Sequence, residues 1–99
     1  ALLSRHLPIN SFKCSDTQAL FEGKRVKRWV NIERPALRKL AQLDWSAVLD
    51  DLKVPPGNGL EALKGDRRGQ HSIRINKQWR VCFVWAADGA GGVEIVDYH

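Results

Sequence analysis

The stretch 93–99, VEIVDYH, carries three residues whose side chains can take part in proton chemistry, Asp97, Tyr98 and His99. Histidine titrates near neutral pH and can act as a general acid or base. Tyrosine can stack on a nucleobase or move a proton. The residues before them alternate as in a β-strand, so we expect the three side chains to leave the end of the last strand of a sheet. A polar tail without a function is the alternative that composition leaves open.

A second group of candidates is cationic and lies in the stretch 64–80, KGDRRGQHSIRINKQWR. Cationic side chains can hold a phosphodiester and stabilise the additional negative charge of its transition state. Arg80 has an alternative interpretation as a simple ion-pair partner of Glu94 or Asp97. Lys64 and Arg80 belong to the basic group, and we expect RNA binding by four further residues of it: Arg67, Arg68, Arg74 and Lys77.

The sequence offers no metal-binding pattern, because no pair of cysteines and histidines has ligand spacing and no glycine loop is suited to cradle phosphates. We therefore predict phosphodiester cleavage without metal or cofactor, which suits RNA because its own 2′-hydroxyl can attack. Cys14 and Cys82 are expected to be free thiols. His71 shares strand parity with Ile73 and Ile75, which favours a place in the core or at its rim over catalysis.

The charge distribution favours a phosphate-rich partner. The 99 residues carry a formal net charge of +5, and two basic stretches, 24–39 and 64–80, flank the acidic stretch 44–52. No apolar run approaches the ~20 residues of a membrane span, so we expect a cytoplasmic protein without a membrane partner. Because the sequence contains no methionine, residues 1–8 are predicted to be an N-terminal extension, and residues 9–99 a single domain.

The order of predicted elements indicates an α+β fold. A short strand over 9–14 is followed by a short helix over 15–23 and a longer helix over 33–52 that breaks near Ser46. Trp29 and Trp45 flank these helical segments and are expected to pack. After Gly59 the apolar residues recur at every second position, which is typical of strands. The predicted strands are 60–65, 70–75, 79–85 and 92–98. We expect two or three helices packed on one face of a mainly antiparallel sheet of four to five strands.

Side-chain parity fixes one register of that sheet. A turn at residues 76–78 pairs Ile75 with Trp79, and it places Arg74 opposite Arg80 on the face away from the helices. Like charges directly opposite each other are destabilising, so an anion is expected between or above them. If Arg80 only projects from this face, its replacement by alanine should leave stability unchanged or raise it.

The stretch 59–85, GLEALKGDRRGQHSIRINKQWRVCFVW, together with the closing VEIVDYH, resembles the HigB branch of the RelE-type bacterial toxins. The resemblance covers Ile9 to His99. It implies a toxin of a type II toxin–antitoxin pair with a microbial-RNase-like sheet. It also implies a ribosome-dependent endonuclease that cleaves mRNA in the ribosomal A site and inhibits translation. The implied partners are the ribosome, mRNA and a HigA-like helix-turn-helix antitoxin, with operator DNA contacted only through the antitoxin.

The same resemblance implies roles for single residues. By family motif, Lys64 and Arg80 contact the scissile phosphate, and the catalytic set becomes Lys64, Arg80, Asp97, Tyr98 and His99. Some relatives carry a histidine where this chain has Glu61, so the general acid and base stay open, and Glu61 and Arg74 are further catalytic candidates. Two other functions stay open as well: a non-catalytic RNA- or DNA-binding module of this fold, and an interaction protein whose basic face binds an acidic partner.

Overall fold

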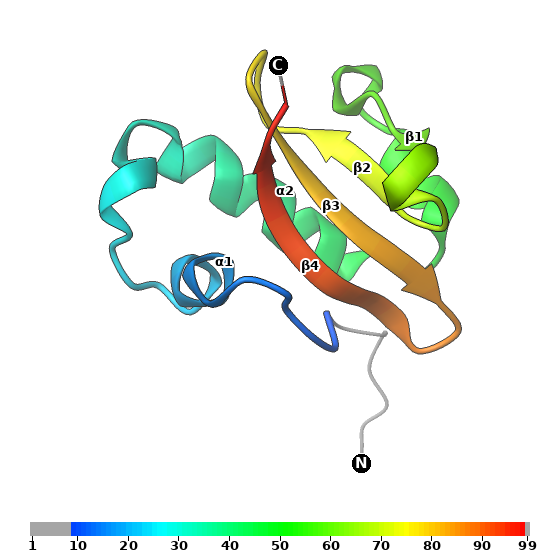
Figure 1. Cartoon of the computed structure of the whole chain (residues 1–99), viewed down its shortest axis with the longest axis horizontal. Helices are drawn as coiled ribbons and strands as arrows, with labels where there is room; N and C mark the ends of the chain where they lie inside the picture. The colour runs from blue at the N-terminus through cyan, green and yellow to red at the C-terminus, as the bar shows by residue number, and fades with distance from the viewer. Residues whose placement is uncertain (1–8, 99) are drawn as a thin grey trace.

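The computed structural model describes residues 9–98, so the expected extension 1–8 and the candidate His99 lie outside the described residues. Two α-helices precede a four-stranded sheet, which confirms the predicted α+β class (Figure 1). The helices are α1 (Ser15–Phe21) and α2 (Glu33–Trp45), and the strands are β1 (Glu61–Ala62), β2 (His71–Arg74), β3 (Trp79–Ala86) and β4 (Gly89–Asp97). Short 3₁₀ helices connect them at Lys27–Ile32, Leu49–Lys53, Pro56–Asn58 and Gly65–Arg67.

Helix α2 ends where the sequence predicts a break. Ser46 takes an extended conformation as the C-terminal cap, and its hydroxyl donates to the carbonyl of Gln42 at 2.8 Å. The buried face of α2 consists of Ala36, Leu40 and Leu43. The helix therefore packs through every third or fourth residue, as an amphipathic helix must.

One of the two tryptophans predicted to pack is exposed instead. Trp29 is buried as expected, but Trp45 is 70% exposed, so the packing role predicted for Trp45 is wrong. Trp45 is the last residue of α2, and the chain leaves the helix at Ser46.

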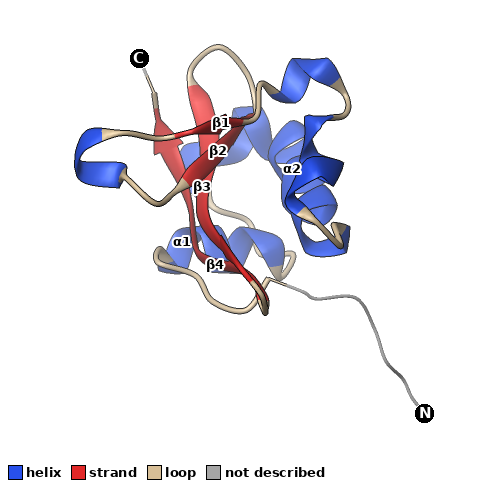
Figure 2. Cartoon of the chain, turned by 90° about the vertical axis from the view of Figure 1, so that its right-hand side faces the viewer, coloured by secondary structure: helices blue, strands red, loops and turns tan. Residues whose placement is uncertain are grey.

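The four strands are antiparallel throughout, in the order β1-β2-β3-β4. One sheet face supplies Ile73, Val81 and Phe83 to the core, which it shares with Leu20 of α1 and Leu40 of α2. Helix α2 lies against this side of the sheet (Figure 2). The prediction of helices on one sheet face is therefore confirmed.

All four strands differ in length from the prediction, and β1 differs most. Strand β1 has only two residues, because the chain turns after Lys64 into a 3₁₀ helix that begins at Gly65, whose φ is +63°. Strand β4 begins at Gly89 rather than at residue 92, since Ala86 already pairs with Gly89. The turn between β3 and β4 is correspondingly shorter than expected.

The segment before α1 is extended but is not a regular strand, which corrects the prediction for residues 9–14. It makes two isolated parallel bridges to β4, Ile9 with Ala90 and Phe12 with Val93. Farther along β4, the buried hydroxyl of Thr17 accepts a hydrogen bond from the backbone N–H of Ile95 at 3.1 Å. These contacts cover the outer edge of β4, which would otherwise offer unpaired groups to another strand.

Candidate functional site

The predicted pairing of the two arginines is confirmed. Arg74 on β2 and Arg80 on β3 are direct partners in the antiparallel register. Arg80 alternates with the core residues Val81 and Phe83, so its side chain lies on the opposite sheet face. We call this the outer face and define it by Ser72, Arg80, Cys82 and Glu94.

Arg80 is buried on the outer face, with 5% of the residue exposed. Its Nε donates to Oγ of Ser72 at 2.8 Å, and its Nη2 donates to the carbonyl of Gly59. The same Nη2 lies 3.3 Å from Oε1 of Glu61, whose side chain is 51% exposed. Gly59 has a left-handed φ of +52°, a conformation that glycine adopts without a Cβ penalty. Within residues 9–98, the structure describes no hydrogen bond from Nη1 of Arg80.

These contacts bear on three expectations. The carboxylate beside Arg80 belongs to Glu61, not to Glu94 or Asp97. This protein anion offsets the charge that an external anion was expected to balance. Because Arg80 is buried and hydrogen-bonded, a neutral or stabilising effect of Arg80→Ala is no longer expected.

The end of β4 brings one more candidate to Arg80. The guanidinium carbon of Arg80 lies 5.4 Å from the ring centroid of Tyr98, within cation–π range. Gln78, in the turn between β2 and β3, holds this end of β4: its carbonyl accepts from the N–H of Tyr98, and its Nε2 donates to Oδ2 of Asp97 at 3.0 Å. In Figure 1 this turn and the end of β4 lie at the same end of the sheet. Glu61, Arg80 and Tyr98 thus gather at one place, while the carboxylate of Asp97 is bound to Gln78.

The remaining cations of the basic stretch divide into two kinds. Lys64, Arg68, Arg74 and Lys77 are exposed, as RNA-binding residues need to be. Arg67 is different, because its Nη1 donates to Oε2 of Glu94 at 2.9 Å. That hydrogen bond raises the pKa of the Arg67 guanidinium.

Sequence reasoning missed three residues that position the candidates, Ser72, Gly59 and Gln78, and it suggested Glu94 for Arg80 instead of Arg67. Ser72 had a usable signal, because it shares the outward parity of Arg74 on β2 and is nevertheless small and polar. Gly59 had none, since a carbonyl acceptor leaves no mark in a side-chain pattern.

His71 and the two cysteines lie as predicted. His71 is half-buried, and its ring stacks on Phe83 with centroids 6.3 Å apart. Cys14 and Cys82 are free thiols. Among residues 9–98, no group of three or more potential ligands is placed to hold a metal ion, and no helix is long and apolar enough to cross a membrane.

Comparison with known proteins decides the family. The family described as RelE-like toxin of type II toxin-antitoxin system HigB matches residues 10–99. The chain belongs to this HigB-like family. It is 38% identical over 90 residues to Toxin HigB-1 of Vibrio cholerae serotype O1, a match that covers 89% of this chain and 94% of that protein. An uncharacterized protein of Haemophilus influenzae is 38% identical over 55 residues, which is 56% of this chain and 54% of that protein. The resemblance stated from the sequence is therefore confirmed, and membership of a type II toxin–antitoxin system implies a cognate antitoxin.

Proposed function

We propose that this HigB-like toxin is an endoribonuclease that cleaves mRNA on the translating ribosome and so inhibits translation. The observation that carries the proposal is the state of Arg80. Ser72 and Gly59 hold its guanidinium from the protein side, Tyr98 lies over it, and Nη1 makes no hydrogen bond within the described residues. Such a preorganised cation stabilises the charge that develops on a phosphodiester undergoing cleavage.

The cleavage step needs no group beyond RNA and side chains. The 2′-hydroxyl attacks the adjacent phosphorus and loses its proton to a base, and the 5′-oxygen leaves with a proton from an acid. The products carry a 2′,3′-cyclic phosphate and a 5′-hydroxyl. Arg80 and Lys64 bind the phosphate, a role that the family motif implies. His99 and Glu61 are the candidates for proton transfer, and Glu61 has the added support of lying 3.3 Å from Arg80.

The open shape of the outer face supports dependence on the ribosome. The structure encloses no pocket within residues 9–98, so RNA lies on a surface rather than in a cleft. In-line attack demands tight orientation of the 2′-hydroxyl and the leaving oxygen. A ribosomal A site that holds the codon supplies the orientation that an open face lacks.

We further propose that the cognate antitoxin is a HigA-like helix-turn-helix protein and binds the basic helical side. The cations Lys24, Arg25, Lys27, Arg34 and Arg38 are exposed there. They come from α2 and the segment before it, not from the outer face that carries Arg80. An acidic antitoxin surface on this side blocks entry to the ribosome without covering the catalytic residues.

The test compares cleavage of one defined mRNA in two states, programmed in a ribosome complex and free in solution. We expect cleavage only on the ribosome, and the products should carry cyclic phosphate ends. Cleavage should continue when a chelator of divalent ions is added after the ribosome complex has formed. Rapid cutting of free RNA, or products with 5′-phosphates, contradicts the proposal. Ribosome binding without any cut identifies the chain as a non-catalytic RNA-binding module.

A pair of variants separates the two proton-transfer candidates. Glu61→Gln keeps the shape of the side chain and removes its basicity, whereas removal of His99 leaves Glu61 intact. The residue that acts in proton transfer is the one whose change flattens a limb of the pH–rate profile near neutrality. If neither change alters the profile, both residues leave the catalytic set.

A further inference from the structure

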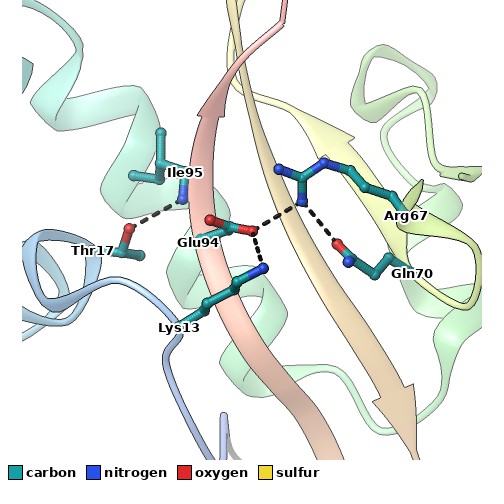
Figure 3. A network of polar contacts seen from close by, with 6 residues as sticks. All are labelled: Lys13, Thr17, Arg67, Gln70, Glu94 and Ile95. Carbon is teal, nitrogen blue, oxygen red and sulfur yellow. Dashed lines mark hydrogen bonds and ion pairs between the residues drawn. The ribbon is translucent and has the colours of Figure 1, made fainter. Parts of the chain in front are cut away.

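The outer face carries a chain of polar contacts separate from those of Arg80 (Figure 3). Oε2 of Glu94 accepts from Nη1 of Arg67 at 2.9 Å, and Nζ of Lys13 lies 3.7 Å from the same oxygen. Nη1 of Arg67 also donates to Oε1 of Gln70 at 3.1 Å. Figure 3 shows the Arg67 side chain reaching from the loop before β2 across β3 to β4. We call the Arg67–Glu94 ion pair the cross-sheet tie.

The cross-sheet tie lies over a small buried layer. Cys82 and Leu63 are 0% and 7% exposed, yet neither belongs to the main hydrophobic cluster between sheet and helices. Cys82 is the direct β-sheet partner of Glu94. Burial raises the pKa of its thiol, and the nearby charge of Arg67 opposes that rise. The tie therefore lies beside Cys82, which would meet water if the loop moved away.

The two ends of the loop 64–70 are joined by a hydrogen bond from the N–H of Leu63 to the carbonyl of Gln70 at 2.8 Å. Three further backbone hydrogen bonds stay inside the loop, from the N–H groups of Arg67, Arg68 and Gln70 to the carbonyls of Lys64, Gly65 and Arg67. Gly65 and Gly69 both have positive φ values, +63° and +95°. The cross-sheet tie is the contact that reaches from the middle of this loop to β4. Lys64 and Arg68, on either side of Arg67 in the loop, are exposed.

We propose that the cross-sheet tie positions the loop 64–70, so that Lys64 and Arg68 face the RNA backbone while Arg67 does not contact RNA. Arg67 is thus a positioning residue. Its bond to Glu94 is charge-assisted and partly shielded, with side-chain exposures of 32% and 16% for the two partners. Both hydrogen bonds of the Arg67 side chain within the described residues use Nη1, so a phosphate at its other donors would lie close to the Glu94 carboxylate, whose negative charge repels it. The inference rests on the proposed function, in which Lys64 and Arg68 bind RNA.

The substitution Glu94→Gln separates the two roles by the sign of its effect. If Arg67 is a positioning residue, the loop is released and the single-turnover cleavage rate on the ribosome falls by about tenfold or more, since small misplacements cost this much. If Arg67 is an RNA ligand restrained by Glu94, the same change frees it and raises RNA affinity. Arg67→Gln lowers the cleavage rate in either case. Only the positioning role predicts that the double variant Arg67→Gln/Glu94→Gln loses no more of the cleavage rate than each single variant.

Two neighbouring cations serve as matched controls. Lys13→Gln removes the other cation on Glu94 without touching the loop, so cleavage stays at the wild-type rate. Arg68→Gln removes an RNA ligand without touching the tie. Binding to a single-stranded RNA oligonucleotide then loses about 0.7 from its logarithmic salt slope, whereas Arg67→Gln leaves the slope unchanged. A loss of slope in Arg67→Gln overturns the proposal.

A measurement on the protein alone keeps this test independent of the proposed function. In a Cys14→Ser background, iodoacetamide should alkylate Cys82 about tenfold faster in the Glu94→Gln variant than in its parent or in the Lys13→Gln control, because release of the loop exposes the thiol. Arg67→Gln should also expose Cys82, but with a smaller gain in rate, because it removes the positive charge that lowers the pKa of that thiol. Unchanged labelling of Cys82 overturns the tie whether or not the toxin cleaves RNA. Faster labelling with a wild-type cleavage rate overturns the positioning role. Absence of cleavage by the wild type counts against the proposed function alone.

Discussion

Replacing Arg80 with alanine removes a buried donor, and the structure gives the size of the expected loss. Ser72 is 0% exposed and loses the charged partner of its hydroxyl, a bond worth about 1.5–3 kcal/mol. The pair with Glu61 contributes only ~0–1 kcal/mol, because that carboxylate is half exposed. Relief of the repulsion with Arg74 returns up to ~1 kcal/mol. We expect a net destabilisation of about 0.5–4 kcal/mol, and a melting temperature lower by roughly 4–8 °C per kcal/mol for a domain of this size.

The assay combines urea unfolding, followed by tryptophan fluorescence, with single-turnover cleavage on a programmed ribosome. Ser72→Ala is the matched control, because it removes the same hydrogen bond but keeps the guanidinium. Arg80→Lys keeps a charge but not the planar fork of donors. We expect Arg80→Ala to be destabilised and inactive at temperatures where it is fully folded. Ser72→Ala should lose comparable stability and retain much of the rate.

Two results refute this reasoning in different ways. If Arg80→Ala is as stable as the wild type, the hydrogen bond to Ser72 does not contribute as its burial indicates. If Ser72→Ala loses as much activity as Arg80→Ala, the activity loss reports the integrity of the sheet and not contact with the phosphate.

Removal of His99 should lower the cleavage rate by about 10²–10⁴-fold without weakening ribosome binding, and a near-normal rate excludes it as general acid or base. Iodoacetamide at neutral pH should label Cys14 well before Cys82. Burial alone would raise the pKa of the Cys14 thiol, but hydrogen bonds to Thr17 and the backbone lower it overall. The pKa of the Cys82 thiol is raised, because burial dominates there. Equal labelling rates in the folded protein contradict this. Thr17→Val should lower the free energy of unfolding by about 1–3 kcal/mol, because the buried N–H of Ile95 loses its acceptor; wild-type stability by urea unfolding contradicts that role.

The pairing of Arg74 with Arg80 was predictable because two local rules suffice for it. Strand parity and the length of the turn at residues 76–78 together leave one register that keeps apolar side chains on one face. The break of α2 near Ser46 was predictable for a similar reason, since the residues that end the helix are adjacent to it in the sequence.

The ion pairs of the outer face were not predictable, because charge alone does not say which acid meets which base. The sequence suggested Glu94 or Asp97 for Arg80, but Glu94 binds Arg67, which is 27 residues away in the chain. Arg80 instead meets Glu61, because β1 is hydrogen-bonded to β2 and places Glu61 opposite Ser72. Both choices depend on the packing of strands against loops, which no pattern of neighbouring residues contains.

Arg80 and Arg67 therefore have different roles, although both belong to the basic stretch 64–80. Arg80 is held mainly by neutral oxygens, and Glu61, its acidic partner among residues 9–98, is exposed enough to be replaced by a phosphate. Arg67 is held by a shielded carboxylate that also attracts Lys13, so exchange with a phosphate leaves an acid facing the RNA. On the proposed RNA-cleaving surface, the first kind of arginine binds the phosphate and the second kind lies behind it, where the ion pair positions the loop that supplies further cations.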